Sequence, residues 1–198
     1  MRPHDVLPPP ALDAGRLAEL AARLAGELQT GGDPPGRPPA AWQVPLLLAA
    51  DLEAWLLGWP AGFVTPAHDH GGSTVAVTVL EGALTEECLD PTIWTTCRRT
   101  TWRAGSTTVF PPGHVHVLGA GGDRPAVAVH AFTPRWDRRS AGGAAAFPLG
   151  GGSPGGGRLA VAAGGDAAAL LAGGRAGRVQ QLADGALDAG HVGDRVAG

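Results

Sequence analysis

The 198-residue chain contains no lysine, tyrosine or asparagine, and only two cysteines and one methionine. Arginine is the only strongly basic side chain, and the formal net charge of -3 at pH 7 is close to neutral. We expect neither a nucleic-acid partner nor a polybasic membrane-binding surface, because both need an excess of positive charge. The absence of tyrosine and asparagine also removes phenol and asparagine amide groups from any site.

The two cysteines, Cys88 and Cys97, are too few for a disulfide framework, although they can approach each other in a hairpin. Two thiols in a chain of this length are typical of a reduced cytosolic protein. The first residues, Met1-Arg-Pro-His-Asp5, lack the apolar region of a signal peptide. We therefore expect a cytoplasmic protein that does not enter a membrane, and the sequence leaves its oligomeric state open.

Composition divides the chain into three segments. Residues 1–39 hold one amphipathic helix, expected over 13–29, and a Pro-rich connector, because leucines recur at helical spacing and Asp13 can cap the start. Residues 141–198 are dominated by Gly and Ala, and we expect a low-complexity tail that is too poor in large apolar side chains to fold.

Residues 40–140 show short apolar runs separated by Gly, Pro or Asp, a pattern typical of an all-β sandwich or barrel. The expected strands are Val44–Ala49, Glu53–Trp59, Thr74–Leu80, Ala83–Cys88, Trp94–Thr101, Thr107–Phe110, Val115–Gly119 and Ala126–Thr133.

Two motifs within this segment point to a metal. In the first, His68 and His70 flank Asp69, so on a strand both imidazoles face the same side. In the second, His116 follows a Pro-X-Gly turn and would come from a later strand across the barrel. His114 shares the strand parity of His116, and motif spacing favours His116. Three neutral imidazoles on a first-row metal leave positions open for substrate and oxygen.

Read together, the motifs resemble the two sequence motifs of the cupins, which implies a double-stranded β-helix, or jelly-roll, barrel. The alternative is that His68 and His70 are histidines of a surface loop; an isolated short motif would not exclude this, but two motifs in register favour the cupin. The position that is normally Glu is Val75, and a position that is normally Asn is Ala120. Without the carboxylate the ligand set is neutral, so a divalent metal keeps its charge and favours an anionic ligand such as a thiolate.

A more specific resemblance covers about residues 40–137. It is to the cysteine dioxygenase (type I) family of thiol dioxygenases, on His68-Asp-His70, Leu80-Glu-Gly-Ala-Leu-Thr-Glu86, His116 and Val127-Ala-Val-His-Ala-Phe-Thr-Pro134. In that family three histidines bind iron(II), the thiol and amine of cysteine chelate it, and O2 oxidises the sulfur to a sulfinate. The resemblance implies that Fe(2+) is the cofactor and that His68, His70 and His116 are its ligands. It also implies that His130 is the outer-sphere histidine, which lies near the metal without binding it.

The position of His130 in the sequence also indicates a functional role, independently of the resemblance. It stands on the last expected core strand beside Val127 and Val129, where a buried imidazole can hydrogen-bond an oxidised substrate. The structural alternative is a core histidine whose polar atoms are satisfied by other groups of the protein.

The sequence departs from the family pattern in four places. Ala128 and Phe132 stand where a Ser and a Tyr are typical, and Val75 stands where animal members carry the Cys that is linked to that Tyr. The arginine that clamps the substrate carboxylate is missing, and Gln43 is the nearest polar group to its expected place. Other arginines lie between or after the motifs, and surface exposure is the simpler expectation for them: Arg98, Arg99, Arg103 and Arg135.

The sequence thus predicts a cupin that uses iron(II) and O2 to oxidise a small thiol, by default L-cysteine, to its sulfinate, with His130 catalytic and Gln43 contacting the substrate. Two alternatives stay open. One is a metallo-cupin enzyme acting on a substrate that is not a thiol, and the other is a degenerate cupin that binds a metal or ligand without catalysis.

Overall fold

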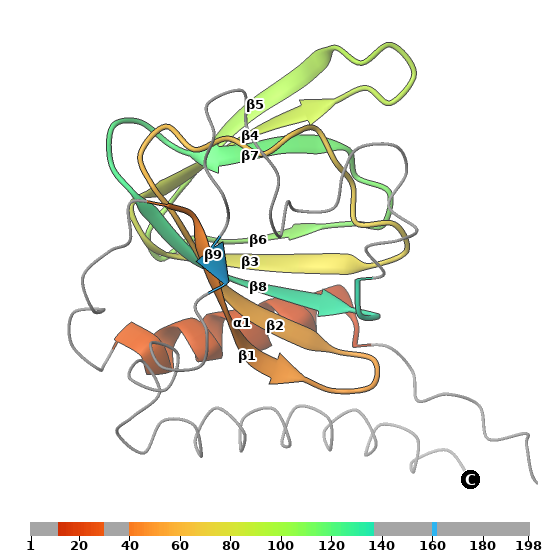
Figure 1. Cartoon of the computed structure of the whole chain (residues 1–198). Coiled ribbons are helices and arrows are strands. Elements are labelled where there is room, and N and C mark those ends of the chain that lie inside the picture. Colours follow the sequence, from red (N-terminus) through yellow and green to blue (C-terminus); the bar gives the residue numbers. More distant parts are fainter. Residues whose placement is uncertain (1–11, 30–39, 137–159, 162–198) are drawn as a thin grey trace, which may run out of the picture.

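A computed structural model describes residues 12–29, 40–136 and 160–161 of the chain (Figure 1). It begins with the helix α1 (Ala14–Gln29), whose leucine and alanine stripe is buried. The backbone N–H of Arg16 donates to the Asp13 carboxylate over 2.9 Å, so Asp13 caps the helix as predicted. Each buried leucine contributes about 1.5–3 kcal/mol, so packing holds the helix in place.

The strands form two sheets. The larger sheet has the order β6-β3-β8-β2-β1-β9 and the smaller one the order β5-β4-β7, and pairing is antiparallel except between β1 and β9. The strands are β1 (Trp42–Leu48), β2 (Glu53–Trp59), β3 (Thr74–Glu81), β4 (Ala83–Leu89), β5 (Thr96–Arg103), β6 (Thr107–Phe110), β7 (His116–Ala120), β8 (Ala126–Thr133) and β9 (Ala160–Val161).

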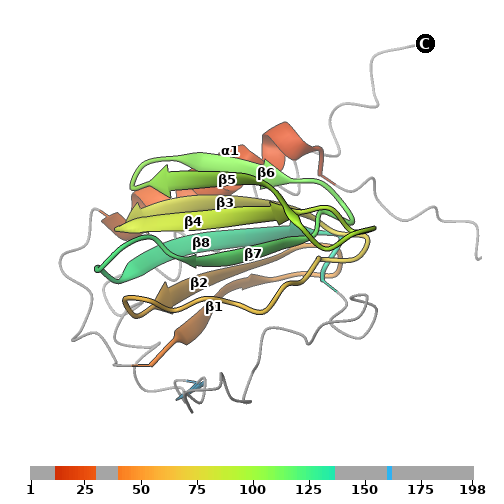
Figure 2. The same ribbon diagram turned by 90° about the horizontal axis from the view of Figure 1, so that it is seen from above.

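The larger sheet lies between the helix and the smaller sheet (Figures 1 and 2). On β8, Val129 and Ala131 pack with the helix, while Ala128 and Phe132 belong to the second core between the sheets. Because side chains alternate along a strand, His130 shares the inner face with Ala128 and Phe132. Three valines of β3, Val75, Val77 and Val79, are buried in the same inner core.

The architecture confirms the predicted all-β cupin fold with an N-terminal helix. The eight strands expected between residues 40 and 140 are all present, with ends that differ by up to two residues. The largest difference is at β5, which begins at Thr96 because Trp94 adopts a φ of 55° and closes a turn on the carbonyl of Asp90.

The expected connector and tail lie mostly outside the described residues. Within the tail 141–198 the structure describes Ala160–Val161 alone, which pair in parallel with the edge strand β1. Among the described residues, no helix has both the length and the apolar character that a membrane span requires.

Candidate metal centre

The two sequence motifs are joined by backbone hydrogen bonds. The N–H of His68 donates to the carbonyl of His116 over 2.9 Å, and the N–H of His116 donates back to the carbonyl of His68 over the same distance. Further along, the N–H of Thr65 donates to Leu118 of β7 over 2.8 Å. The chain before His68 is thus a short partner of β7, and the ring centroids of His68 and His116 lie 4.8 Å apart.

A tight turn places the third histidine. The Asp69 carboxylate accepts the N–H of Gly71 over 2.7 Å, and Gly71 in turn accepts the N–H of Gly113 from the second motif over 2.9 Å. Both glycines have positive φ angles, 57° and 69°, which a side chain would strain. The ring of His70 is therefore held 5.1 Å, centroid to centroid, from each of the other two histidine rings.

The three histidines offer ligand atoms that lie within 4.8 Å of one another, and all three side chains are buried. The Nδ1 of His68 lies 2.9 Å from the carbonyl of Pro66, which can only accept, so Nδ1 carries the proton and Nε2 the lone pair. Similarly, the Nδ1 of His116 faces the carboxylate of Glu86 over 3.4 Å. Its Nε2 is buried and has no hydrogen-bond partner among the described residues.

Burial keeps these imidazoles neutral. It lowers the pKa of His68 to about 3, with His116 as the second cause, and it moves the pKa of His70 in the same direction. The pKa of His116 is also lowered, chiefly by burial, although Glu86 opposes the shift. A metal binds neutral imidazole, so three neutral, buried rings whose ligand atoms lie close together fit a divalent metal such as iron(II).

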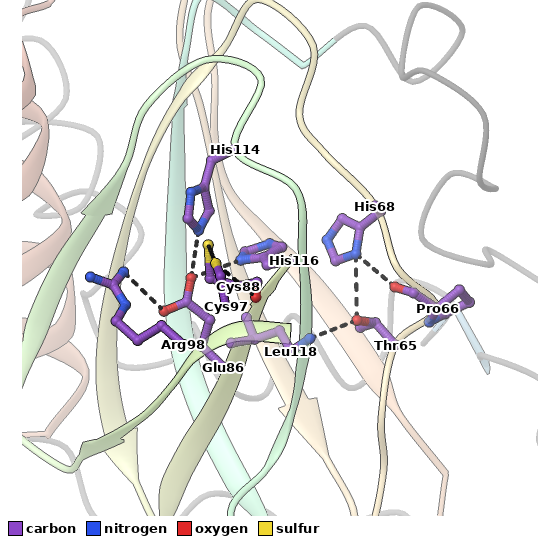
Figure 3. A network of polar contacts seen from close by, with 10 residues as sticks. All are labelled: Thr65, Pro66, His68, Glu86, Cys88, Cys97, Arg98, His114, His116 and Leu118. Carbon is purple, nitrogen blue, oxygen red and sulfur yellow. Dashed lines mark hydrogen bonds and ion pairs between the residues drawn. The ribbon is translucent and has the colours of Figure 1, made fainter. Parts of the chain in front are cut away.

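Glu86, in the middle of β4, is a residue of the site to which the sequence motifs assign no role. Its side chain is fully buried, and its Oε1 accepts hydrogen bonds from the Nε2 of His114 over 2.6 Å and from the Nδ1 of His116 (Figure 3). The guanidinium of Arg98 approaches the other carboxylate oxygen at 3.9 Å. Burial alone would raise the pKa of Glu86, but the hydrogen bonds from the two histidines outweigh it and lower the pKa to about 2.

Glu86 therefore stays ionised and fixes the tautomer of His116. A carboxylate that accepts the distal N–H of a ligating histidine sets the ring orientation and raises its basicity. His114 lies in a second group with Glu86 and His116, whose possible ligand atoms are also within 4.8 Å of one another. The hydrogen bond from His114 to Glu86 makes His114 a residue that helps to hold the Glu86 carboxylate in place. The group that includes His68 and His70 contains His116 and not His114.

Aromatic rings close one side of the cluster. Phe132 of β8 lies 5.6 Å from His70, and Trp136 lies 5.2 Å from the same ring, both in edge-on contact. Phe110 of β6 contacts His116 at 4.7 Å. These rings surround the histidines with hydrocarbon and limit the access of water, and Trp136 was not singled out from the sequence.

His130 lies within electrostatic reach of the cluster. Its side chain is 1% exposed and its Nε2 has no hydrogen-bond partner among the described residues. Burial, followed by His116 and His68, lowers the pKa of His130 to about 3. The ring is thus a neutral, buried imidazole beside the histidine cluster, with a nitrogen available to a bound molecule.

Gln43 is on the inner face of β1 but is not joined to the cluster. It is buried and stands opposite Leu57 of the inner core. Within the described residues it makes no hydrogen bond to a histidine. Three of the four arginines considered as replacements for the missing clamp pair with glutamates, and the fourth is exposed: Arg98 with Glu86, Arg99 with Glu87, Arg135 with Glu53, and Arg103 in solvent.

The barrel and its buried histidine cluster define the class of the protein, a cupin with a candidate metal site. The family model described as cysteine dioxygenase type I matches residues 48–141. Over these residues, which form most of the barrel, the chain is similar to the cysteine dioxygenase type I family.

Several solved structures are similar to this chain. KdgF from Halomonas sp. is 20% identical over 55% of this chain and 93% of that chain, with a TM-score of 0.43. A cupin-like protein from Thermotoga maritima is 19% identical over 48% and 69%, with a TM-score of 0.42. A conserved protein with a double-stranded β-helix domain from Klebsiella pneumoniae is 19% identical over 50% and 81%, with a TM-score of 0.42. The comparison with curated protein sequences gives no match.

Proposed function

We propose that this protein is an iron(II)- and O2-dependent thiol dioxygenase that converts a small thiol, by default L-cysteine, into its sulfinate. The reaction adds both atoms of O2 to the sulfur, so RSH and O2 give RSO2H with no further reactant. The observation that carries the proposal is the cluster of three neutral, buried histidines inside a barrel that matches the dioxygenase family. We assign the iron ligands to His68, His70 and His116.

Iron(II) would supply adjacent positions for the thiolate and for O2, which removes the entropic cost of bringing the two together. The chain's own residues prepare that place. The hydrogen bond from His68 to Pro66 and the contact between His116 and Glu86 both direct an Nε2 lone pair inward. Phe132 and Trp136 exclude water from the same volume.

His130 is the proposed catalytic side chain beyond the ligands. In the tautomer that carries hydrogen on Nε2, this nitrogen donates a hydrogen bond to an oxygen atom that is being added to the sulfur. Its low pKa keeps the ring neutral at physiological pH, so it acts as a hydrogen-bond donor and brings no charge. Phe132, two residues further on the same face of β8, cannot add a phenolic hydroxyl to this interaction.

Gln43 is the proposed contact for the polar end of the substrate. It is a buried amide on the inner face of β1, and a single amide binds a carboxylate more weakly than a paired arginine does. We therefore expect weaker selection for a carboxylate-bearing thiol than an arginine would give. The place of action that we propose is the cytoplasm, where small thiols are kept reduced.

Oxygen uptake tests the proposal directly. Protein loaded anaerobically with iron(II) is offered cysteine, 3-mercaptopropionate and cysteamine in separate assays, with product identified by mass spectrometry. We expect O2 uptake in a one-to-one ratio with sulfinate for one of these thiols, and its loss in His116→Ala. Protein that binds one iron per chain but consumes no O2 with any of the three contradicts the proposal.

One observation favours a binding role as the second candidate. The positions beside His130 on β8 are Ala128 and Phe132, both buried, so no hydroxyl from this face reaches the cluster. A cupin of this kind would retain its metal and bind a thiol without oxidising it. Stoichiometric metal, a thiol-induced change in its absorption spectrum and no O2 uptake would together establish that role, whereas a spectrum indifferent to every thiol would point to a metallo-cupin with another substrate.

A further inference from the structure

The two cysteines of the chain meet near the end of the β4–β5 hairpin, on the face of the smaller sheet that also carries Glu86 and His116. The Sγ of Cys97 on β5 lies 3.2 Å from the Sγ of Cys88 on β4, and both thiols are free (Figure 3). Cys97 is exposed, and Cys88 is partly buried. The chain has no third cysteine, so each thiol has a single intramolecular partner.

A bulge in the hairpin creates this contact. The register pairs Cys88 with Arg98 and Leu89 with Thr96, so Cys97 is an extra residue that the β4 strand does not match. In a regular ladder, neighbouring residues point to opposite faces, and Cys97 would face away from Cys88. A bulge changes the direction of a side chain locally, and here it turns the second thiol toward the first.

The cysteine pair is a neighbour of the candidate metal centre in the smaller sheet. Cys88 stands directly opposite His116 in the pairing of β4 with β7, and Glu86 lies two residues before it on the same strand. The Sγ atoms need to approach by only about 1 Å to reach the bond length of a disulfide. An exposed disulfide of this kind is readily reduced, which suits a transient state in a reducing compartment.

We propose that Cys88 and Cys97 are a redox modification site, which a low-molecular-weight disulfide converts into a reversible intramolecular disulfide. The Cys97 thiolate attacks a sulfur of the small disulfide RSSR, forms a mixed disulfide and releases one RS⁻. The Cys88 thiolate then attacks the Cys97 sulfur, forms the Cys88–Cys97 bond and releases the second RS⁻. The protein loses two electrons and two protons, and RSSR is reduced to two RSH.

Exposure decides the order of the two attacks. Cys97 is open to solvent, whereas burial, followed by the contact with Cys97, raises the pKa of Cys88 to about 11. The exposed thiol therefore meets the oxidant first, and the partly buried one resolves the mixed disulfide. This inference does not depend on whether the barrel oxidises thiols.

The test uses the full-length protein with oxidised glutathione as the small disulfide. We expect the product to have lost two hydrogens, to carry no glutathione, to run as a monomer without reductant, and to react with no iodoacetamide until dithiothreitol is added. Cys88→Ser is expected to stop at the glutathione adduct of Cys97. A matched control keeps two thiols but moves one, in the double variant Thr96→Cys with Cys97→Ser.

Thr96 suits this control because its hydroxyl donates to the carboxylate of Glu87, which places it on the other face of the hairpin. We expect the control to accumulate mixed disulfides with glutathione. For the wild type, we expect the equilibrium constant for forming the Cys88–Cys97 disulfide to be at least tenfold larger in the folded protein than in urea. Wild-type protein that retains glutathione, forms only intermolecular dimers, keeps both thiols reactive, or closes no better than the control overturns the proposal.

Discussion

Replacing Glu86 with glutamine is the sharpest test of how the histidine cluster is organised. The change keeps the size of the side chain and removes its charge. In the native protein one carboxylate oxygen accepts from both His114 and His116, at 2.6 and 3.4 Å. A glutamine oxygen still accepts but has lost the charge, and if its NH2 group turns toward His116, it favours the tautomer that places the proton on Nε2. That tautomer cannot bind a metal through Nε2.

The expected effect on metal affinity follows from this. Loss of the carboxylate partner of a ligating histidine typically weakens metal binding about 10- to 100-fold, or about 1.4–2.7 kcal/mol. We expect a weakening of this size for Glu86→Gln in anaerobic titrations with iron(II) against a competing chelator, and with cobalt(II) as a spectroscopic probe. Circular dichroism and thermal unfolding of the metal-free variant establish that the barrel is folded.

The neighbouring residue provides a matched control. Glu87 undergoes the same chemical change in Glu87→Gln, but its carboxylate pairs with Arg99 on the exposed side of the hairpin. We expect the metal affinity of Glu87→Gln to stay within about twofold of the wild type. The Glu87–Arg99 pair contacts none of the three histidines, and an exposed ion pair contributes only about 0–1 kcal/mol to stability. Equal affinities for the wild type and both variants would refute the role assigned to Glu86.

Three further predictions concern the stability of the metal-free protein, measured by urea unfolding. Burial lowers the pKa of His130 to about 3, so below pH 6.5 the unfolded chain binds more protons than the folded chain does. The free energy of unfolding therefore falls as the pH drops toward 3, by about 2 kcal/mol at pH 5 from this group alone. We expect His130→Gln to reduce the dependence of the unfolding free energy on pH. Gly82→Ala is expected to destabilise more than Gly62→Ala, since both have positive φ but only a Cβ at Gly82 would collide with the carbonyl of Pro125, and equal losses would contradict this. Leu24→Ala, in the buried stripe of α1, is expected to cost about 2–5 kcal/mol, and a loss below 1 kcal/mol would show that the helix is not anchored as described.

The fold could be predicted from the sequence because helices and strands follow from patterns of neighbouring residues. The helix follows from leucines at every third or fourth position and from Asp13, and the strands from short apolar runs between turn residues. The beginning of β5 was placed two residues too early, at Trp94, because the turn that closes on Asp90 depends on one residue with a positive φ. Nothing in the residue type predicts that conformation for tryptophan.

The candidate site could be predicted only where its residues belong to a motif. His68, His70 and His116 have fixed spacings, and the structure brings the three together. Glu86 ends one of the stretches that resemble the family, but no role follows from that, and although its spacing from Leu84 puts it on the same face of the strand, a glutamate is rarely expected to be fully buried. Its burial against His116 depends on β4 pairing with β7, which is a long-range contact. Gln43 illustrates the converse, since the sequence named it only as the polar group nearest to the missing arginine, and among the described residues it makes no hydrogen bond to the histidines.

The departures from the family pattern gather on one wall of the barrel. The ligand side, formed by the segment before β3 and by β7, keeps all three histidines. The changed positions, Val75, Ala128 and Phe132, are all on the inner face of the larger sheet. Val75 and Phe132 are direct cross-strand partners, so a hydrocarbon pair stands where animal members of the family link a cysteine to a tyrosine.

This separation has a chemical consequence. If the proposed function holds, the wall that would bind the metal and the wall that would face substrate and oxygen are different parts of the barrel. Substitutions on β3 and β8 would then alter reactivity without moving a proposed ligand. His130 is the one polar group that β8 still presents beside Phe132, and its imidazole is neutral. Metal affinity should therefore follow Glu86 and the three ligands, while oxygen consumption and the choice of thiol should follow His130 and its apolar neighbours.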